Sequence, residues 1–142
     1  MVVHKNLVYQ STAYNQFILI TSDVEKLVEE SGVQEGMVYV MTKHTTTGIC
    51  VNEALECLES DISVLLGKLA PEDGMYSHAR ILDSYGATAG NPTGHLKSHL
   101  TNYFAIFPVS KGKIVRGSAQ DIYFAEFDGP QRRTVMVTIM GE

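Results

Sequence analysis

The sequence predicts an α+β fold with a mostly antiparallel β-sheet or β-sandwich, packed with one long helix and one or two short helices. Three observations carry this prediction. Two strand-like segments open the chain, an apolar stripe at helical spacing occupies its middle, and alternating apolar and polar residues fill its last third. Strands, then helices, then a meander of strands are typical of an α+β domain.

The chain is expected to open with two strands and a short helix. Residues 5–11 and 16–20 have strand-like patterns. Ser22 followed by Glu25 is a capping-box pattern, so we expect a helix to begin there and to end at Gly32.

The longest predicted helix follows Asn52 and Glu53 and ends before Pro71. Its large apolar residues recur mostly three or four positions apart, which forms one stripe. We expect this stripe, with Ile62 at its centre, to be core and to receive the apolar face of the sheet. The stripe consists of Leu55, Leu58, Ile62, Leu65, Leu66 and Leu69.

Residues 71–92 have no hydrophobic period and are predicted to form a long loop, which in compact domains is often a functional lid. Asn91 followed by Pro92 marks the start of a short helix that carries His95 and His99.

The last third is predicted to be all β. In order, we expect a strand at 103–109, a hairpin turn at 110–113, a long strand at 114–127 bent near Gly117, a turn at 128–130 and a strand at 132–140. In the final strand, Val135, Val137 and Ile139 share one face.

The composition limits the classes of function. The 142 residues, of which 44% are hydrophobic and 19% charged, suit one globular domain spanning 1–142. The formal net charge of -5 argues against nucleic acid and membrane surfaces as partners, since both need basic patches. We expect no signal peptide and no membrane span. Cys50 and Cys57 lack redox or zinc-finger spacing, which predicts reduced thiols and a cytoplasmic protein.

A polar segment at 43–48 separates the predicted strands 37–42 and 49–51. It contains His44 and three consecutive threonines, and such groups can ligate a metal, move a proton or bind phosphate. The alternative is an ordinary threonine-rich turn with a surface histidine, whose hydroxyls cap its own backbone.

Three histidines are candidate metal ligands. His44, His78 and His95 each lie in a loop or at the end of an element, and three imidazoles can hold zinc or another divalent ion with one position open. Their separations match no local ligand motif. His95 and His99 share a helix face, but no glutamate lies between them, so His99 is expected at the surface or the core edge.

Carboxylates and arginines add further candidates. Glu53 and Glu126 could act as a general base or support a metal ligand, or they could be solvated surface groups. Arg132 and Arg133 could clamp an anion, or their charge could protect a strand edge.

Several short motifs occur together along the chain. They are His44-Thr45-Thr46, Asn52-Glu53, Leu69-Ala70-Pro71-Glu72, Tyr76-x-His78, Asn91-x-x-x-His95-Leu96-Lys97-Ser98, Gly112-Lys113 to Gln120-x-Ile122-Tyr123, Glu126-x-Asp128-Gly129-Pro130, Arg132-Arg133 and Val137-Thr138-x-x-Gly141-Glu142. Their order and spacing resemble the YjbQ family, also described as the secondary thiamine-phosphate synthase family, over nearly the whole chain.

The resemblance implies a homotrimer with a cleft near the subunit interface that gathers the histidines. It implies that His44, His78 and His95 bind a divalent metal (zinc, magnesium or manganese) or phosphate. We expect catalytic roles for His44, Glu53, Glu126 and Arg133, and ligand or phosphate binding by Thr45, Thr46, Asn52, Lys97, Gln120 and Arg132.

The implied activity resembles thiamine-phosphate synthesis, in which the nitrogen of a thiazole phosphate displaces pyrophosphate from a pyrimidine pyrophosphate. Such chemistry needs a divalent ion and basic groups around the leaving pyrophosphate. One alternative is a metal-dependent hydrolase or phosphatase of a small phosphorylated molecule. Another is a non-catalytic trimer that binds a metal or ligand.

The chain departs from the family pattern in three places. Gly117-Ser118-Ala119-Gln120 stands where members often have Gly-Thr-Trp-Gln, so a large aromatic is absent. Ser77-His78 stands where members often have two adjacent histidines, and the segment 81–90 looks longer or differently built.

Overall fold

The computed structural model describes residues 1–79 and 90–142, which form two β-sheets and several helices. No helix of this described part is long and apolar enough to cross a bilayer. The elements are β1 (Val2–Gln10), β2 (Gln16–Leu19), α1 (Thr21–Ser31), β3 (Glu35–Thr42), β4 (Thr47–Asn52), α2 (Glu56–Leu69), the 3-10 helix η1 (Ser77–Ala79), α3 (Pro92–Leu100), β5 (Phe104–Ser110), β6 (Lys113–Ile114), β7 (Asp121–Glu126) and β8 (Arg132–Gly141).

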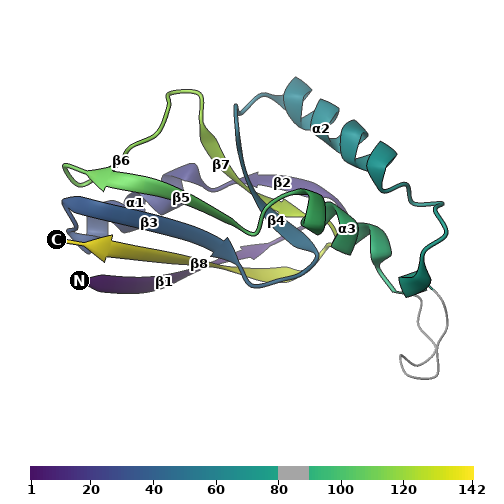
Figure 1. Ribbon diagram of the computed structural model, residues 1–142, viewed down its shortest axis with the longest axis horizontal. Helices are drawn as coiled ribbons and strands as arrows, with labels where there is room; N and C mark the ends of the chain where they lie inside the picture. The colour runs from purple at the N-terminus through teal and green to yellow at the C-terminus, as the bar shows by residue number, and fades with distance from the viewer. Residues whose placement is uncertain (80–89) are drawn as a thin grey trace.

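The strands form a five-stranded sheet in the order β1-β8-β3-β5-β6 and a three-stranded sheet in the order β2-β7-β4. Every pairing is antiparallel, and the first strand of the chain pairs with the last. Figure 1 shows α2 and α3 toward the end of the molecule opposite the chain termini. The predicted α+β class with mostly antiparallel strands is confirmed.

The core lies between the two sheets. Val135, Val137 and Ile139 of β8 are fully buried, as their alternation predicts. They belong to one cluster with Ile122 and Phe124 of β7 and with buried residues of α1. Burying one such side chain contributes about 1.5–3 kcal/mol, so this inter-sheet layer stabilises the fold.

Helix α1 begins differently from the prediction. It starts at Thr21, and no side chain caps its first turn, so the predicted capping box at Ser22 does not form. The Thr21 hydroxyl instead donates to Asp121 and accepts from the N–H of Ile122, which ties the helix start to β7. Gly32 ends the helix as predicted, with a left-handed φ of 77°.

The prediction that the stripe of α2 is core is wrong. Leu66 is its one buried residue, Ile62 is half-buried, and Leu65 and Leu69 are 55% and 59% exposed. Leu66 and Ile62 reach only a small second cluster around Phe127. Since the two sheets bury their apolar faces against each other, they leave most of α2 uncovered.

The predicted long strand 114–127 is also wrong. It divides into β6 and β7, which belong to different sheets. Between them the chain turns: the N–H of Gly117 donates to the Gln120 side chain, and Arg116 donates to the Gln120 carbonyl and to Glu25 on α1. This turn carries the chain from one sheet to the other.

The polar segment 43–48 is shorter as a loop than predicted, because Thr47 and Gly48 are buried in β4. Within it, His44 completes the β3–β8 ladder. The last pair of that ladder joins Thr42 to Val135, and the N–H of Thr134 then donates to Nε2 of His44 at 3.0 Å. The imidazole thereby takes the place of a strand carbonyl.

His44 must be neutral to accept this hydrogen bond. Desolvation by burial is the main cause that lowers its pKa, and the positive charge of Arg133 adds to it. A histidine whose pKa is lower in the folded state stabilises the fold above its unfolded pKa. This contribution is lost as the pH falls through the folded pKa.

We expect Leu66→Ala to cost about 2–5 kcal/mol of unfolding free energy, since it removes buried methyl groups. The neighbouring Leu65→Ala is the matched control and, at a concentration at which the protein is a single chain, should cost less than about 0.5 kcal/mol, because Leu65 is 55% exposed there. Chemical denaturation measures both. Equal losses of unfolding free energy in the two variants would show that Leu65 is also buried and would contradict this description of α2.

We expect the stability of the wild type relative to His44→Gln to be constant in mildly alkaline buffer and to decrease below about pH 6.5. The glutamine amide oxygen can accept the Thr134 N–H but does not titrate in this range. Urea denaturation from about pH 8 to pH 5 measures the difference. Parallel pH dependence in the two proteins would contradict this account of His44.

Candidate functional site

Two of the three predicted metal-binding histidines lie side by side. The ring centroids of His78, on η1, and His95, on α3, are 5.0 Å apart, and the rings meet edge to face at 77°. Their Nε2 atoms lie 3.1 Å and 3.0 Å from a single acceptor, Oδ1 of Asn91. The structure therefore brings together two imidazoles from separate helices around one amide oxygen.

Asn91 occupies the position that sequence reasoning assigned to a helix cap. Helix α3 begins at Pro92, as predicted, but the Asn91 side chain makes no capping hydrogen bond. Its amide nitrogen donates to Oδ2 of Asp128, in the turn between β7 and β8. The side chain thus bridges the histidine pair and this turn.

The turn lies close against α3. A Cβ atom at Gly94 would be 2.9 Å from the carbonyl oxygen of Phe127 and 3.4 Å from Cβ of Asp128. Glycine at this position therefore lets the helix approach the turn closely enough for Asn91 to reach Asp128.

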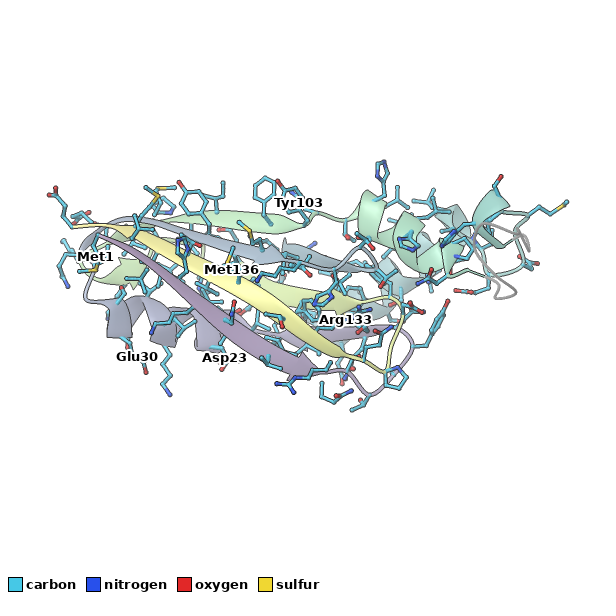
Figure 2. The ribbon with its side chains drawn as sticks, turned by 90° about the horizontal axis from the view of Figure 1, so that it is seen from below. Met1, Asp23, Glu30, Tyr103, Arg133 and Met136 are labelled. Atoms are coloured by element: carbon cyan, nitrogen blue, oxygen red, sulfur yellow. The ribbon has the colours of Figure 1, made fainter. Side chains whose placement is uncertain are left out.

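A buried ion pair lies directly behind the turn. Glu126 is 0% exposed and Arg133 is 5% exposed. Nε of Arg133 donates to Oε1 of Glu126 at 2.8 Å, and Nη2 donates to Oε2 at 2.6 Å. The same Nη2 donates to the hydroxyl of Thr46 at 2.8 Å. Figure 2 shows Arg133 in the part of the sandwich remote from Met1.

The carboxylate of Glu126 is fully hydrogen-bonded. Burial raises its pKa, but hydrogen bonds from Arg133, from the Ser11 hydroxyl and from the N–H of Asp128 outweigh this, so the pKa lies below its usual value. Glu126 is therefore an ionised counter-charge in the interior. In this structure Glu126 and Arg133 bind each other, so a substrate would have to displace one of them to use the other. A proton-accepting role for Glu126 and anion binding by Arg133 stay predictions.

The other predicted ligand-binding residues lie in different surroundings. Thr45 and Arg132 are exposed, and Thr46 is buried beside Arg133. Gln120 borders a hollow of about 410 Å³ between β4 and β5. Asn52 accepts the N–H of Glu53 at 2.9 Å, and both residues are exposed.

Lys97 is unexpectedly buried. Its side chain is 7% exposed, and its ammonium lies 3.8 Å from Oε1 of Glu72. Glu72 also accepts from the hydroxyls of Thr93 and Tyr14. The hydrogen bond with Thr93 lowers the pKa of Tyr14, but burial and the negative charge of Glu72 outweigh it, so this pKa is raised. This network fixes α3 against the segment that leaves α2.

A shallow hollow of about 390 Å³ borders the histidine pair. Apart from the two imidazoles it is lined by Tyr76, Ser77, Pro92 and Leu96. The combination of mainly apolar walls and two convergent imidazoles is typical of a site for a small ligand.

The predicted three-histidine metal site is only partly assembled. His44 makes its Nε2 contact with the Thr134 backbone. Residues 1–79 and 90–142 contain no group of three or more His, Cys, Asp or Glu side chains that could hold a metal ion. Of the three predicted ligands, His78 and His95 lie together.

Asn91 and Asp128 are the members of this site that sequence reasoning did not assign to it. Asn91 was recognised as a helix start, and Asp128 as part of a turn. Asn91 lies four residues before His95, a spacing that puts both on one helix face. Its contact with Asp128 gives no signal in the sequence, because that contact depends on how α3 packs on the β7–β8 turn.

A model of the family described as UPF0047 protein YjbQ-like matches residues 5–142. A UPF0047 protein of Archaeoglobus fulgidus is 41% identical over 122 residues, which are 86% of this chain and 89% of that protein. The UPF0047 protein YugU of Bacillus subtilis is 34% identical over 137 residues, 96% of this chain and 98% of that protein.

Solved structures agree with these relatives. A YbjQ-like protein of unknown function from Sulfolobus solfataricus P2 has a TM-score of 0.91 at 30% identity and covers 100% of this chain and 99% of its own. A YjbQ/UPF0047 protein of Clostridium acetobutylicum has a TM-score of 0.84 at 38% identity, with 96% and 99% covered. The chain thus belongs to the YjbQ-like UPF0047 family.

Proposed function

We propose that this protein binds a small phosphorylated molecule in the hollow beside His78 and His95 and acts on it as an enzyme. The convergence of these two imidazoles at an accessible hollow is the observation that carries the proposal. Imidazole is the side chain suited to proton transfer or metal binding near neutral pH.

The leading reaction is the coupling of a pyrimidine pyrophosphate with a thiazole phosphate, as the family resemblance implies. The thiazole nitrogen forms a bond to the pyrimidine methylene carbon, and the bond from that carbon to the pyrophosphate oxygen breaks. A divalent ion (zinc, magnesium or manganese), when bound, would neutralise charge on the leaving pyrophosphate.

Within one chain the basic groups divide their roles. Arg133 is committed to Glu126, so we assign it to holding the β7–β8 turn. Arg132 is exposed and remains able to contact an anion. Lys97 lies on the same helix as His95, but it is buried and paired with Glu72, so we assign it to holding α3 in place.

Hydrolysis of a small phosphate compound is the second candidate. His78 is exposed, so water can reach the histidine pair. One imidazole could then remove a proton from the attacking water. This reaction differs in its products, because it releases phosphate from one substrate rather than pyrophosphate from two.

We also propose a homotrimer located in the cytoplasm. Leu55, just before α2, and Val64, Leu65 and Leu69 of α2 are each more than 40% exposed. The face of the five-stranded sheet that points away from the core adds Ile106 and Met140, which are 43% and 41% exposed. Large uncovered apolar surfaces favour burial in an assembly. Cys50 and Cys57 are unpaired, consistent with a reducing compartment.

Purified wild type should release pyrophosphate from a pyrimidine pyrophosphate only when a thiazole phosphate is supplied. His95→Gln should lower this rate about 100-fold or more, because it removes a proton carrier or ligand. His99→Gln is the matched control, since His99 is an exposed histidine on the same helix, and it should retain wild-type activity.

Product analysis separates the readings. Free phosphate from a single substrate would replace the coupling reaction by hydrolysis. Ligand binding without turnover, weakened by His95→Gln, would favour a protein that binds a ligand without catalysis over both reactions.

Elemental analysis of the wild type beside a His78→Gln/His95→Gln variant should find about one divalent ion per chain, lost in the variant. No uptake of zinc, magnesium or manganese would remove the metal from the proposal.

Light scattering should give about three times the mass of one chain if the trimer forms. Leu65→Lys and Ile106→Lys place a charge on the two uncovered apolar surfaces, and the variant that dissociates identifies the interface. A wild-type protein with the mass of a single chain at micromolar concentration would contradict the trimer.

A further inference from the structure

The contacts around Asn91 restrict the protonation of both histidines. Its carbonyl oxygen lies 3.1 Å from Nε2 of His78 and 3.0 Å from Nε2 of His95. A carbonyl oxygen only accepts hydrogen bonds, so each contact requires a proton on Nε2. In a neutral imidazole the other nitrogen, Nδ1, is then unprotonated and carries a lone pair.

The orientation of the Asn91 amide is therefore decisive. If the amide were rotated by 180°, its NH₂ group would face both rings and would favour the opposite tautomer. Asp128 opposes that rotation, because a carboxylate accepts but does not donate. In the observed orientation the amide NH₂ donates to Oδ2 of Asp128.

Asp128 is in turn held by the interior. Its N–H donates to Oε2 of Glu126 at 3.0 Å, and its carbonyl accepts from the Gln131 side chain at 2.8 Å. The buried pair of Glu126 and Arg133 thus fixes the backbone on which the Asp128 carboxylate stands.

We propose that Asp128 and Asn91 are positioning residues, which keep His78 and His95 protonated on Nε2 and leave Nδ1 of His95 as a free acceptor. No hydrogen bond to that Nδ1 comes from residues 1–79 or 90–142. It is the atom that takes a proton from a substrate O–H or N–H group, or that ligates an ion. The tautomer rests on these contacts alone, while its use in catalysis rests on the proposed function.

The proposal defines what the site recognises. A group that binds to the His95 imidazole through a lone pair must itself offer a proton or a positive charge. A protonated phosphate oxygen, an amine or a divalent cation meets this requirement, and a bare carbonyl oxygen does not. The carboxylate acts on the rings only through the intervening amide.

The test is an imidazole ¹H–¹⁵N correlation spectrum of the full chain near neutral pH. The wild type should show Nε2–H signals for His78 and His95, together with unprotonated Nδ1 resonances. Asp128→Asn removes the charge that orients Asn91, and proton exchange with water should become about tenfold faster or the signals should vanish. Asp73→Asn, at an exposed carboxylate before η1, is the matched control and should leave the spectrum unchanged.

A double variant makes the test specific for hydrogen-bond polarity. In Asn91→Asp/Asp128→Asn the carboxylate moves to position 91, where it accepts from both rings and from the new amide, so the Nε2–H signals should return. Rings protonated on Nδ1 in the wild type, unchanged signals in Asp128→Asn, or a folded double variant without recovery would each overturn the proposal. Circular dichroism reports folding.

Intact Nε2–H signals in a protein without turnover would refute the proposed activity and leave the positioning role of Asn91 and Asp128 standing.

Discussion

The buried ion pair between Arg133 and Glu126 joins the two sheets at the end of the molecule that carries the histidines. Arg133 belongs to β8 in the five-stranded sheet, and Glu126 belongs to β7 in the three-stranded sheet. Two charges at this depth are tolerated only because Ser11, Thr46 and the Asp128 backbone complete their hydrogen bonds. Removing one partner would leave an uncompensated charge in the interior, so the pair and its neighbours act as one unit.

The histidine pair depends on this unit through a short chain of contacts. The ion pair fixes the Asp128 backbone, Asp128 orients Asn91, and Asn91 contacts both imidazoles. A site formed from η1, α3 and the β7–β8 turn therefore gains rigidity from the sandwich rather than from its own loops. The hollow beside it is lined partly by the same two imidazoles, so its shape depends on the same contacts.

Short sequence patterns correctly predicted the features that depend only on neighbouring residues. The alternation in β8, the glycine at the end of α1 and the start of α3 at Pro92 each follow from a few neighbouring residues. The stripe of α2 showed which side of the helix is apolar, but not that the sheets would already be covering each other. His78 and His95 were selected by residue type, whereas the partnership of Asn91 with Asp128 depends on packing between distant segments. Glu126 was ambiguous for the same reason, because its burial requires Arg133 across a turn.

The pairing of the first strand with the last has a consequence for the order of folding. Among residues 1–79 and 90–142, β1 pairs with β8 alone, and β8 also pairs with β3. During synthesis the amino-terminal strand must wait for the final residues of the chain before it enters a sheet, and such long-range pairing slows folding and exposes the early strands. Arg133 also lies on β8, so the polar interior and the histidine pair that it supports assemble at the same late moment. A nascent chain therefore carries all of its site histidines well before it can hold them in place.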